Sequence, residues 1–109
     1  TDAERRRCGY GLLYEVSKSK KKTAPADVFF LDHIKRIRTS FHGETRMVRG
    51  AMGGALMGMG KRSARLNAAA LKVARAIGPI QIGADDSGCE PFDVVKHLSS
   101  DHITKKLGV

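Results

Sequence analysis

Basic side chains gather in the segment between residues 46 and 65. The candidate binding residues there are Arg46, Arg49, Lys61, Arg62, Ser63 and Arg65. Guanidinium and ammonium groups bind phosphate oxygens through charge-assisted hydrogen bonds. The amino end of a helix adds unpaired N–H groups and a positive dipole end. If Ser63 begins a helix, the segment predicts a phosphate clamp; the alternative is an ordinary capped helix with solvated cations.

Two further basic runs flank the first predicted helix. Arg5, Arg6 and Arg7 precede its middle, and Lys18 with Lys20–Lys22 follows its end. Either run could contact phosphates without sequence preference, and such binding must weaken with salt. Either could equally be a solvated charged surface. Aromatic residues for stacking unpaired bases are sparse, which argues against a single-strand binder.

The overall charge points to an anionic partner. Lys and Arg number 20 against 11 acids, which gives a formal net charge of +9. A charge of this size favours binding to polyanions and fast electrostatic association. Duplex DNA is the partner we expect, and an acidic membrane surface is the weaker competitor.

The residues with acid, base or metal-ligand chemistry form no convincing catalytic set. Asp32 lies between Phe30 and Ile34, so it belongs to a groove edge or, more simply, to an exposed face. Cys89, His97 and His102 do not have the spacing of a zinc site. A glycine-rich strand-to-helix phosphate motif is also missing from the sequence. We therefore assign no catalytic residue and expect neither a metal nor a cofactor.

Hydrophobic periodicity predicts four helices that would position the basic residues. The first spans residues 2–16, begins at Asp2 and buries Cys8, Leu12 and Val16. The second begins at Asp27 and ends at His42–Gly43, with Gly43 in the left-handed position of a carboxyl cap. Its inward stripe is Phe30, Ile34, Ile37 and Phe41.

The third predicted helix, over residues 44–59, is unusual in its glycines. Each interior glycine costs about 1 kcal/mol relative to alanine. Gly50, Gly54 and Gly58 nevertheless share one stripe, which permits close approach of a neighbouring helix or, alternatively, of a DNA backbone. The inward residues are Val48, Met52, Ala55, Leu56 and Met59.

The fourth predicted helix follows Ser63 and stops at Gly78–Pro79. Its inward stripe is Leu66, Ala70, Val73 and Ile77. The four helices form two hairpins about 40 residues apart, a spacing within the range of helical repeats.

A tail should follow and fold back as a cap over the end of the stack. It begins with an extended piece over residues 80–82 and a loop over 83–88. A short helix then has Pro91 in its first turn, with Phe92, Val95 and Leu98 facing inward. Ser100 caps a last turn that ends near Leu107–Gly108.

Much of the chain resembles the carboxy-terminal part of bacterial DNA alkylation repair proteins. The resemblance rests on residues 49–63, on Leu66–Asn67, on residues 69–71 and 74–79, and on the earlier segment 9–15, GYGLLYE. It implies a curved stack of HEAT-like helical repeats whose concave basic face holds duplex DNA. Some members are glycosylases that excise alkylated purines; in those, an aspartate and aromatic residues, notably tryptophans, flank the lesion, and arginines hold the DNA backbone. This sequence contains no Trp and no aspartate that matches the catalytic one.

The sequence thus predicts an all-α, HEAT-like helical-repeat (alpha-alpha superhelix) fragment, with two helical hairpins and a C-terminal capping tail in one domain over residues 1–109. Because it begins at Thr1, we expect the carboxy-terminal part of a longer protein. The two cysteines without redox spacing favour the cytoplasm, and no apolar stretch is long enough for a membrane span.

The predicted function is DNA binding in a DNA alkylation repair-like protein, and two alternatives stay open. One is a non-catalytic scaffold that presents a protein-binding surface made by the glycine-lined helices and Met47, Met52, Met57 and Met59. The other is a complete glycosylase whose catalytic carboxylate lies upstream of Thr1.

Overall fold

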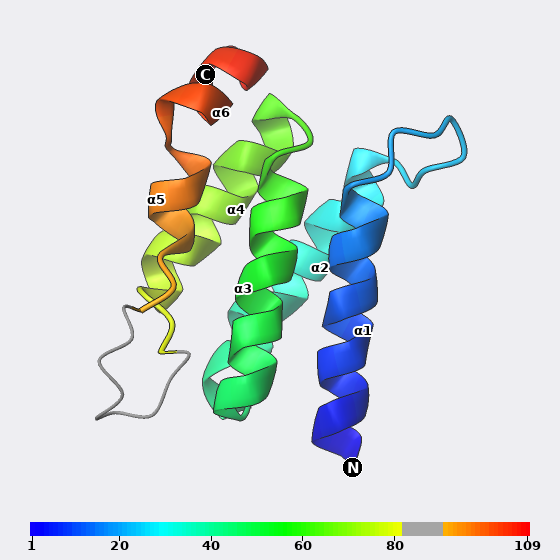
Figure 1. Cartoon of the computed structure of the whole chain (residues 1–109), viewed down its shortest axis with the longest axis vertical. Coiled ribbons are helices and arrows are strands. Elements are labelled where there is room, and N and C mark those ends of the chain that lie inside the picture. Colours follow the sequence, from blue (N-terminus) through cyan, green and yellow to red (C-terminus); the bar gives the residue numbers. More distant parts are fainter. Residues whose placement is uncertain (82–90) are drawn as a thin grey trace.

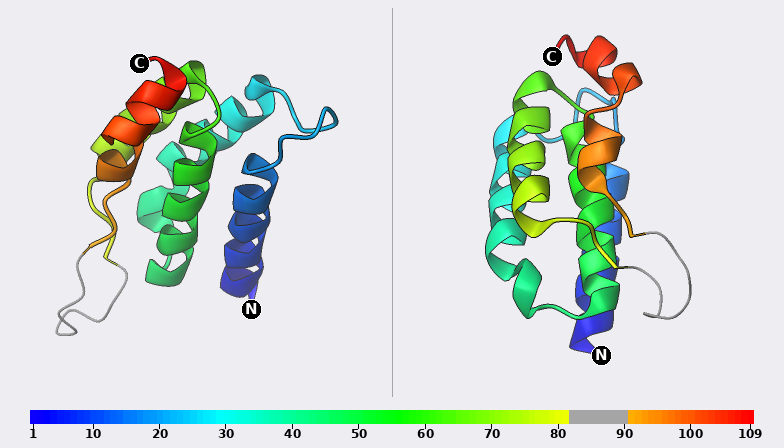
Figure 2. Two further views of the ribbon diagram at one scale, coloured as in Figure 1. Left: turned by 45° about the horizontal axis from the view of Figure 1, so that its top comes forward. Right: turned by 90° about the vertical axis from the view of Figure 1, so that its left-hand side faces the viewer.

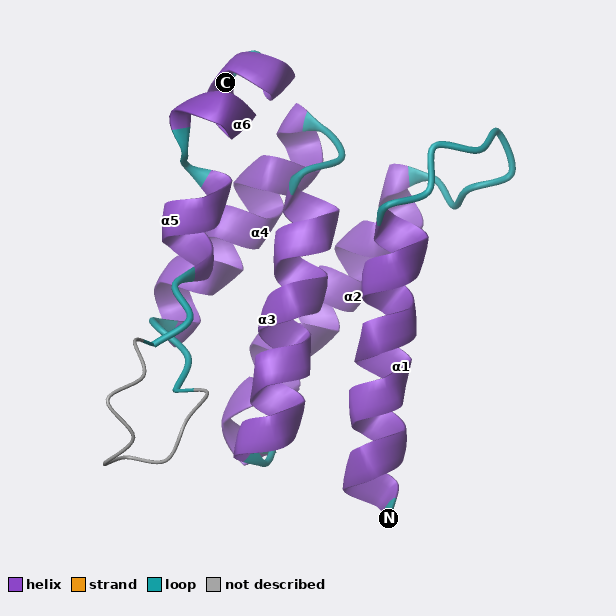
Figure 3. Cartoon of the chain, in the orientation of Figure 1, coloured by secondary structure: helices purple, strands orange, loops and turns teal. Residues whose placement is uncertain are grey.

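The fold is all-α over residues 1–81 and 91–109, which the computed structural model describes (Figure 3). These residues form six α-helices and one short 3-10 turn. The elements are α1 (Asp2–Ser17), α2 (Asp27–Ser40), the 3-10 turn η1 (Phe41–Gly43), α3 (Arg46–Gly60), α4 (Ala64–Ile77), α5 (Val94–Leu98) and α6 (Asp101–Leu107). Among them, no helix is both long and apolar enough to cross a membrane.

The helices form two layers. α1, α3 and α5 lie side by side in one layer, and α2 and α4 form the second layer behind it (Figures 1 and 2). α1 packs along α3, α2 packs along α4, and α5 packs against both α3 and α4. Successive helices alternate between the layers, as expected for a fragment of a helical-repeat protein. The predicted fold class is confirmed.

The core lies between the layers and comes mainly from α2, α3 and α4. The predicted stripes of α2 and α3 are buried throughout, and that of α4 is buried except for the partly buried Ile77. Burial of each Val, Leu, Ile, Phe or Met side chain among them stabilises the fold by about 1.5–3 kcal/mol. The largest fully buried side chains are Phe30, Ile34, Ile37, Met52, Leu56, Met59, Leu66, Ile80, Leu98 and Val48.

The predicted inward stripe of α1 is wrong. Leu12 is 67% exposed and Val16 37% exposed, whereas Leu13 and Ser17 are buried; Cys8 is also exposed. Apolar side chains occur on two faces of this helix, so periodicity alone does not choose between them. The choice is made by α3, which packs against the face that carries Leu13.

Glycines in α3 explain how α1 comes so close. A Cβ on Gly58 would collide with the Ser17 hydroxyl and would lie 2.9 Å from Cδ1 of Tyr14. A Cβ on Gly54, in contrast, would meet nothing within 4 Å. The predicted close approach of a neighbouring helix is therefore confirmed at Gly58 and wrong at Gly54.

Helix ends differ from prediction at the starts of α1 and α3 and at Gly43. Thr1, rather than Asp2, caps α1: its hydroxyl accepts the Glu4 N–H at 3.2 Å, and the Glu4 side chain accepts from the Thr1 amino group. α3 begins at Arg46 because the Thr45 side chain caps it. Gly43 lies in the 3-10 turn η1 and is not among the glycines with positive φ, which in the described residues are Gly78 and Gly108.

The tail packs against the end of the stack, as expected for a cap, because α5 contacts both α3 and α4. Ile80 pairs with Phe92 in an isolated antiparallel bridge, through backbone bonds of 2.7 and 2.8 Å. α5 begins at Val94, so Pro91 precedes the helix rather than lying in its first turn. Ser100 caps α6, and Gly108 ends it. The predicted loop at residues 83–88 and residue 82 fall outside the described residues.

The register of α1 gives a direct stability test. Leu13→Ala should lower the free energy of unfolding by about 2–4 kcal/mol, because it removes a buried side chain. Leu12→Ala should change it by less than about 0.5 kcal/mol, because that side chain is mostly in water. Urea denaturation measures both free energies. A larger loss for Leu12→Ala than for Leu13→Ala would mean that the face with Leu12, not the face with Leu13, packs against α3.

The two glycines offer a second matched pair. Gly54→Ala should raise the free energy of unfolding by about 0.5–1 kcal/mol through helix propensity. Gly58→Ala gains the same propensity but forces α1 away from α3, so it should be less stable than Gly54→Ala by about 1–3 kcal/mol. Equal stabilities of the two variants, measured by thermal or urea unfolding, would rule out the close contact.

Candidate nucleic-acid interface

The predicted binding residues do not converge on one surface. Arg46 and Arg49 lie at the first turn of α3, whereas Lys61 and Arg62 follow its last residue. Since α3 has 15 residues, its ends are about 22 Å apart. A single phosphate clamp cannot include both groups.

Arg49 makes hydrogen bonds within the molecule at its lower end, where α3 begins (Figure 1). Its Nε donates to the Phe41 carbonyl oxygen at 3.0 Å, and Nη2 donates to that of His42 at 2.6 Å. Its guanidinium also lies 5.2 Å from the centroid of the Phe41 ring. The Phe41 carbonyl oxygen also accepts the Glu44 N–H at 3.1 Å, so it has a partner at the end of η1 as well. Arg49 thus joins η1 to α3.

Arg6 is likewise held at this end. Its Nε lies 2.7 Å from Oε2 of Glu44, which precedes α3. The hydrogen bond to Glu44 raises the pKa of Arg6 above its ordinary value, although burial opposes the shift. The pair links α1 to the start of α3, so one arginine of the run Arg5–Arg7 already has an internal partner.

Arg62 connects three elements at the upper end. Its Nη1 donates to the carbonyl oxygens of Ser17 at 2.7 Å and Ser19 at 2.9 Å. The guanidinium lies 4.4 Å from the centroid of the Phe30 ring. Its Nε is buried and has no hydrogen-bond partner among the described residues. Arg62 therefore ties the end of α1 to the α3–α4 turn and to α2.

Ser63 caps α4, as predicted. Its hydroxyl oxygen accepts the Leu66 N–H at 3.2 Å, and the hydroxyl donates to the Asp27 carboxylate at 2.9 Å. Both contacts are internal and join the starts of α4 and α2. Arg65, in the first turn of α4, and Arg46 are exposed.

A pocket of about 420 Å³ lies where these elements meet. We call it the upper basic pocket and define it by its four lysines, Lys18, Lys20, Lys61 and Lys106. Tyr14 and Gly58 are among the other residues that line it. Lys18 lies 4.7 Å from the centroid of the Tyr14 ring and 3.3 Å from Oε2 of Glu15. An anion in this pocket would face cations from three separate segments of the chain.

The sequence pointed to part of this pocket. Lys61 was a candidate, and Lys18 and Lys20 were recognised as a separate basic run. Lys106 was not selected, because only the position of α6 above the stack brings it there (Figure 1). The buried Asn67 was also missed: its Nδ2 donates to the carbonyl oxygens of Gly60 and Leu98, at 3.1 and 3.0 Å, and so fixes α5 beside the end of α3.

Comparisons with known proteins add no assignment: no family model, no curated protein and no solved structure matches the chain. The similarity to DNA alkylation repair proteins therefore stays a prediction. Over residues 1–81 and 91–109, no group of three or more His, Cys, Asp or Glu side chains is placed to hold a metal ion.

The different roles of two adjacent cations can be tested by unfolding. Arg62→Ala should lower the free energy of unfolding by about 2 kcal/mol, because it removes two charge-assisted hydrogen bonds and a ring contact. Lys61→Ala should change it by less than about 0.5 kcal/mol. If chemical denaturation gives similar free energies of unfolding for both variants, the contacts of Arg62 do not hold α1, α2 and the α3–α4 turn together.

Proposed function

We propose that the chain is a DNA-binding helical-repeat module of a DNA alkylation repair-like protein, and that it holds the phosphate backbone of duplex DNA at the upper basic pocket. Any glycosylase activity of such a protein would then depend on catalytic residues other than those of the upper basic pocket. The partner is duplex DNA, as predicted from the sequence. The binding surface is the pocket at the upper end of the molecule instead of the full set of six predicted residues.

The observation that carries the proposal is the convergence of four lysines on one pocket. Exposed lysines on opposite faces would each be solvated singly, whereas lysines around one depression act on the same anion. Their flexible side chains place positive charge without fixed geometry, which suits the uniform phosphate backbone better than the base edges. The remaining positive charge of the chain would assist the approach of DNA.

Arg62 acts in this proposal as a positioning residue. Its two bonds to the carbonyls of Ser17 and Ser19 hold the backbone on either side of Lys18, next to Lys20. Its Nη1 already donates to both carbonyls and its Nε is buried, so we assign the phosphate contacts to the lysines. Of the six predicted clamp residues, Lys61 would then contact phosphate and Arg62 would position the pocket; the other three lysines lie outside the predicted set.

A protein-binding scaffold remains the second candidate, for a different reason from that predicted. Met52 and Met59 are fully buried, and of the four methionines proposed for such a surface only Met47 is among the exposed residues, at 43%. Instead, exposed apolar side chains occur on α1 and α2, where Leu12 and Val28 are each 67% exposed and Phe29 is 42% exposed. Such side chains favour contact with another apolar surface when they form one patch.

The DNA proposal is tested by removing the four lysines together. Replacing Lys18, Lys20, Lys61 and Lys106 with Gln should weaken binding to a random 20-bp duplex by at least about tenfold at low salt. The slope of log K against log salt should also become shallower by about 3.6, which corresponds to four lost phosphate contacts. Fluorescence anisotropy over a salt series measures both quantities.

A matched control removes the same charge from the other layer. The control residues are Lys35, Arg38, Lys72 and Arg75, which are exposed on α2 and α4. Replacing these four with Gln should leave most of the affinity and slope. An equal loss of affinity in the two variants would mean that net charge alone explains the effect. Unchanged binding in the pocket variant would show that the upper basic pocket is not the DNA-binding site.

A further inference from the structure

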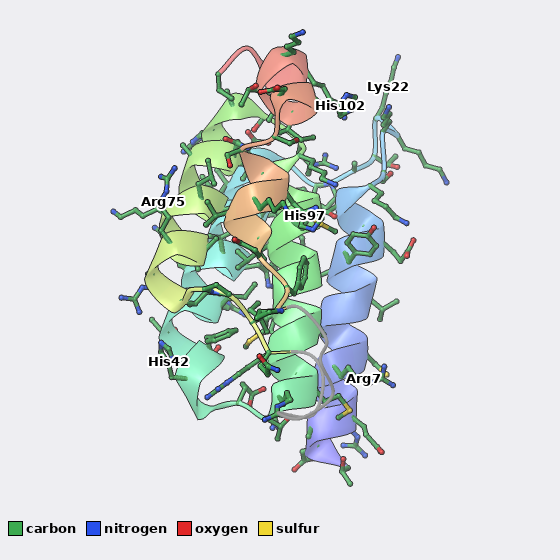
Figure 4. All side chains as sticks on the ribbon, turned by 60° about the vertical axis from the view of Figure 1, so that its left-hand side comes forward. Arg7, Lys22, His42, Arg75, His97 and His102 are labelled. Atoms are coloured by element: carbon green, nitrogen blue, oxygen red, sulfur yellow. The ribbon has the colours of Figure 1, made fainter. Side chains whose placement is uncertain are left out.

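A second pocket, of about 550 Å³, lies beside the upper basic pocket and shares Lys61 with it. α5, the α5–α6 junction and α6 supply most of its lining. We call it the histidine pocket after His97 and His102, which both line it and are exposed. Figure 4 shows the two imidazoles in the upper half of the molecule, far from His42 at the lower end.

The charge of the histidine pocket depends on its two imidazoles. The other ionisable lining residues are Lys61 from the α3–α4 turn, Asp93, which caps α5, and Lys96 within α5. Two lysines and one aspartate sum to +1, and protonation of both histidines brings the sum to +3. Asp93 is partly engaged already, because its Oδ1 accepts the Lys96 N–H at 3.3 Å. Imidazole charge changes in the range between about pH 5 and 8.

Two features make phosphate the fitting ligand class. Ammonium and imidazolium groups both donate charge-assisted hydrogen bonds to its oxygens. The shared Lys61 also places the histidine pocket next to the first anion site, so adjacent phosphates of one backbone could occupy both. The ring of His97 packs edge-on against that of Phe92, with centroids 5.6 Å apart and an interplanar angle of 70°.

We propose that the histidine pocket is a second phosphate-binding site, which grips the backbone more tightly when His97 and His102 are protonated. The involvement of DNA rests on the proposed function; binding of the phosphate group itself does not. A phosphate oxyanion among the imidazoles would favour their protonated forms, so proton uptake and anion binding reinforce each other. DNA affinity should then rise as pH falls from 8 to 6.

Inorganic phosphate tests the site without DNA and without a variant. In a proton NMR titration at pH 6, phosphate should shift the ring signals of His97 and His102. The signals of His33 and His42 serve as internal controls, since neither lines this pocket. Equal movement of all four, or no movement of His97 and His102, would overturn the proposal.

Duplex DNA then tests the coupling to pH. At constant low salt, the wild-type dissociation constant should fall roughly two- to tenfold from pH 8 to 6, as expected for two exposed charge contacts. The His97→Gln, His102→Gln double variant should lose most of this change. The His33→Gln, His42→Gln double variant should retain it.

The outcomes separate the two proposals. DNA binding with the same pH dependence in the wild type and in the His97, His102 double variant would overturn the histidine pocket as a DNA contact and leave the lysine pocket intact. Phosphate shifts at His97 and His102 without any DNA binding would support the site but contradict the proposed function.

Discussion

The connection made by Arg62 is the constraint on which the upper end of the molecule depends. One guanidinium joins the end of α1, the α3–α4 turn and the ring of Phe30. Beside it, Gly58 leaves room for Ser17 and Tyr14. Without the close approach at Gly58, the Ser17 carbonyl would lie farther from Arg62. Packing and polar contacts therefore fix the same position of α1, and that position creates the pocket.

The sequence predicted the fold better than it predicted the site. The stripes of α2, α3 and α4, the Ser63 cap and the stop at Gly78 all depend on local spacing. All are confirmed, apart from Ile77 of the α4 stripe, which is only partly buried. The face of α1 was wrong because Leu12 and Leu13 are equally apolar, and only the partner helix distinguishes them. Likewise, no local pattern shows that Arg49 and Arg62 bond to distant carbonyls, or that α6 brings Lys106 near Lys18.

The arginines and the pocket lysines of this chain differ in the contacts that they make. The arginines at positions 6, 49 and 62 bond internally and join helices, as the planar guanidinium, with its several donors, is well suited to do. The lysines of the upper basic pocket instead line a surface depression, where Lys18 also pairs with Glu15. The positive charge of the chain is therefore divided between arginines that hold the fold and lysines that line the pocket. Counting cations along the sequence overestimates the number that are available to an anion.

Chemical-shift mapping of the amide backbone with a short DNA duplex tests the central claim most directly. Our account predicts that the strongest perturbations fall together on residues 18–20, 58–62 and 106, segments that only the fold brings together. Perturbations confined to the outer faces of α2 and α4, or scattered evenly over both layers, would contradict it.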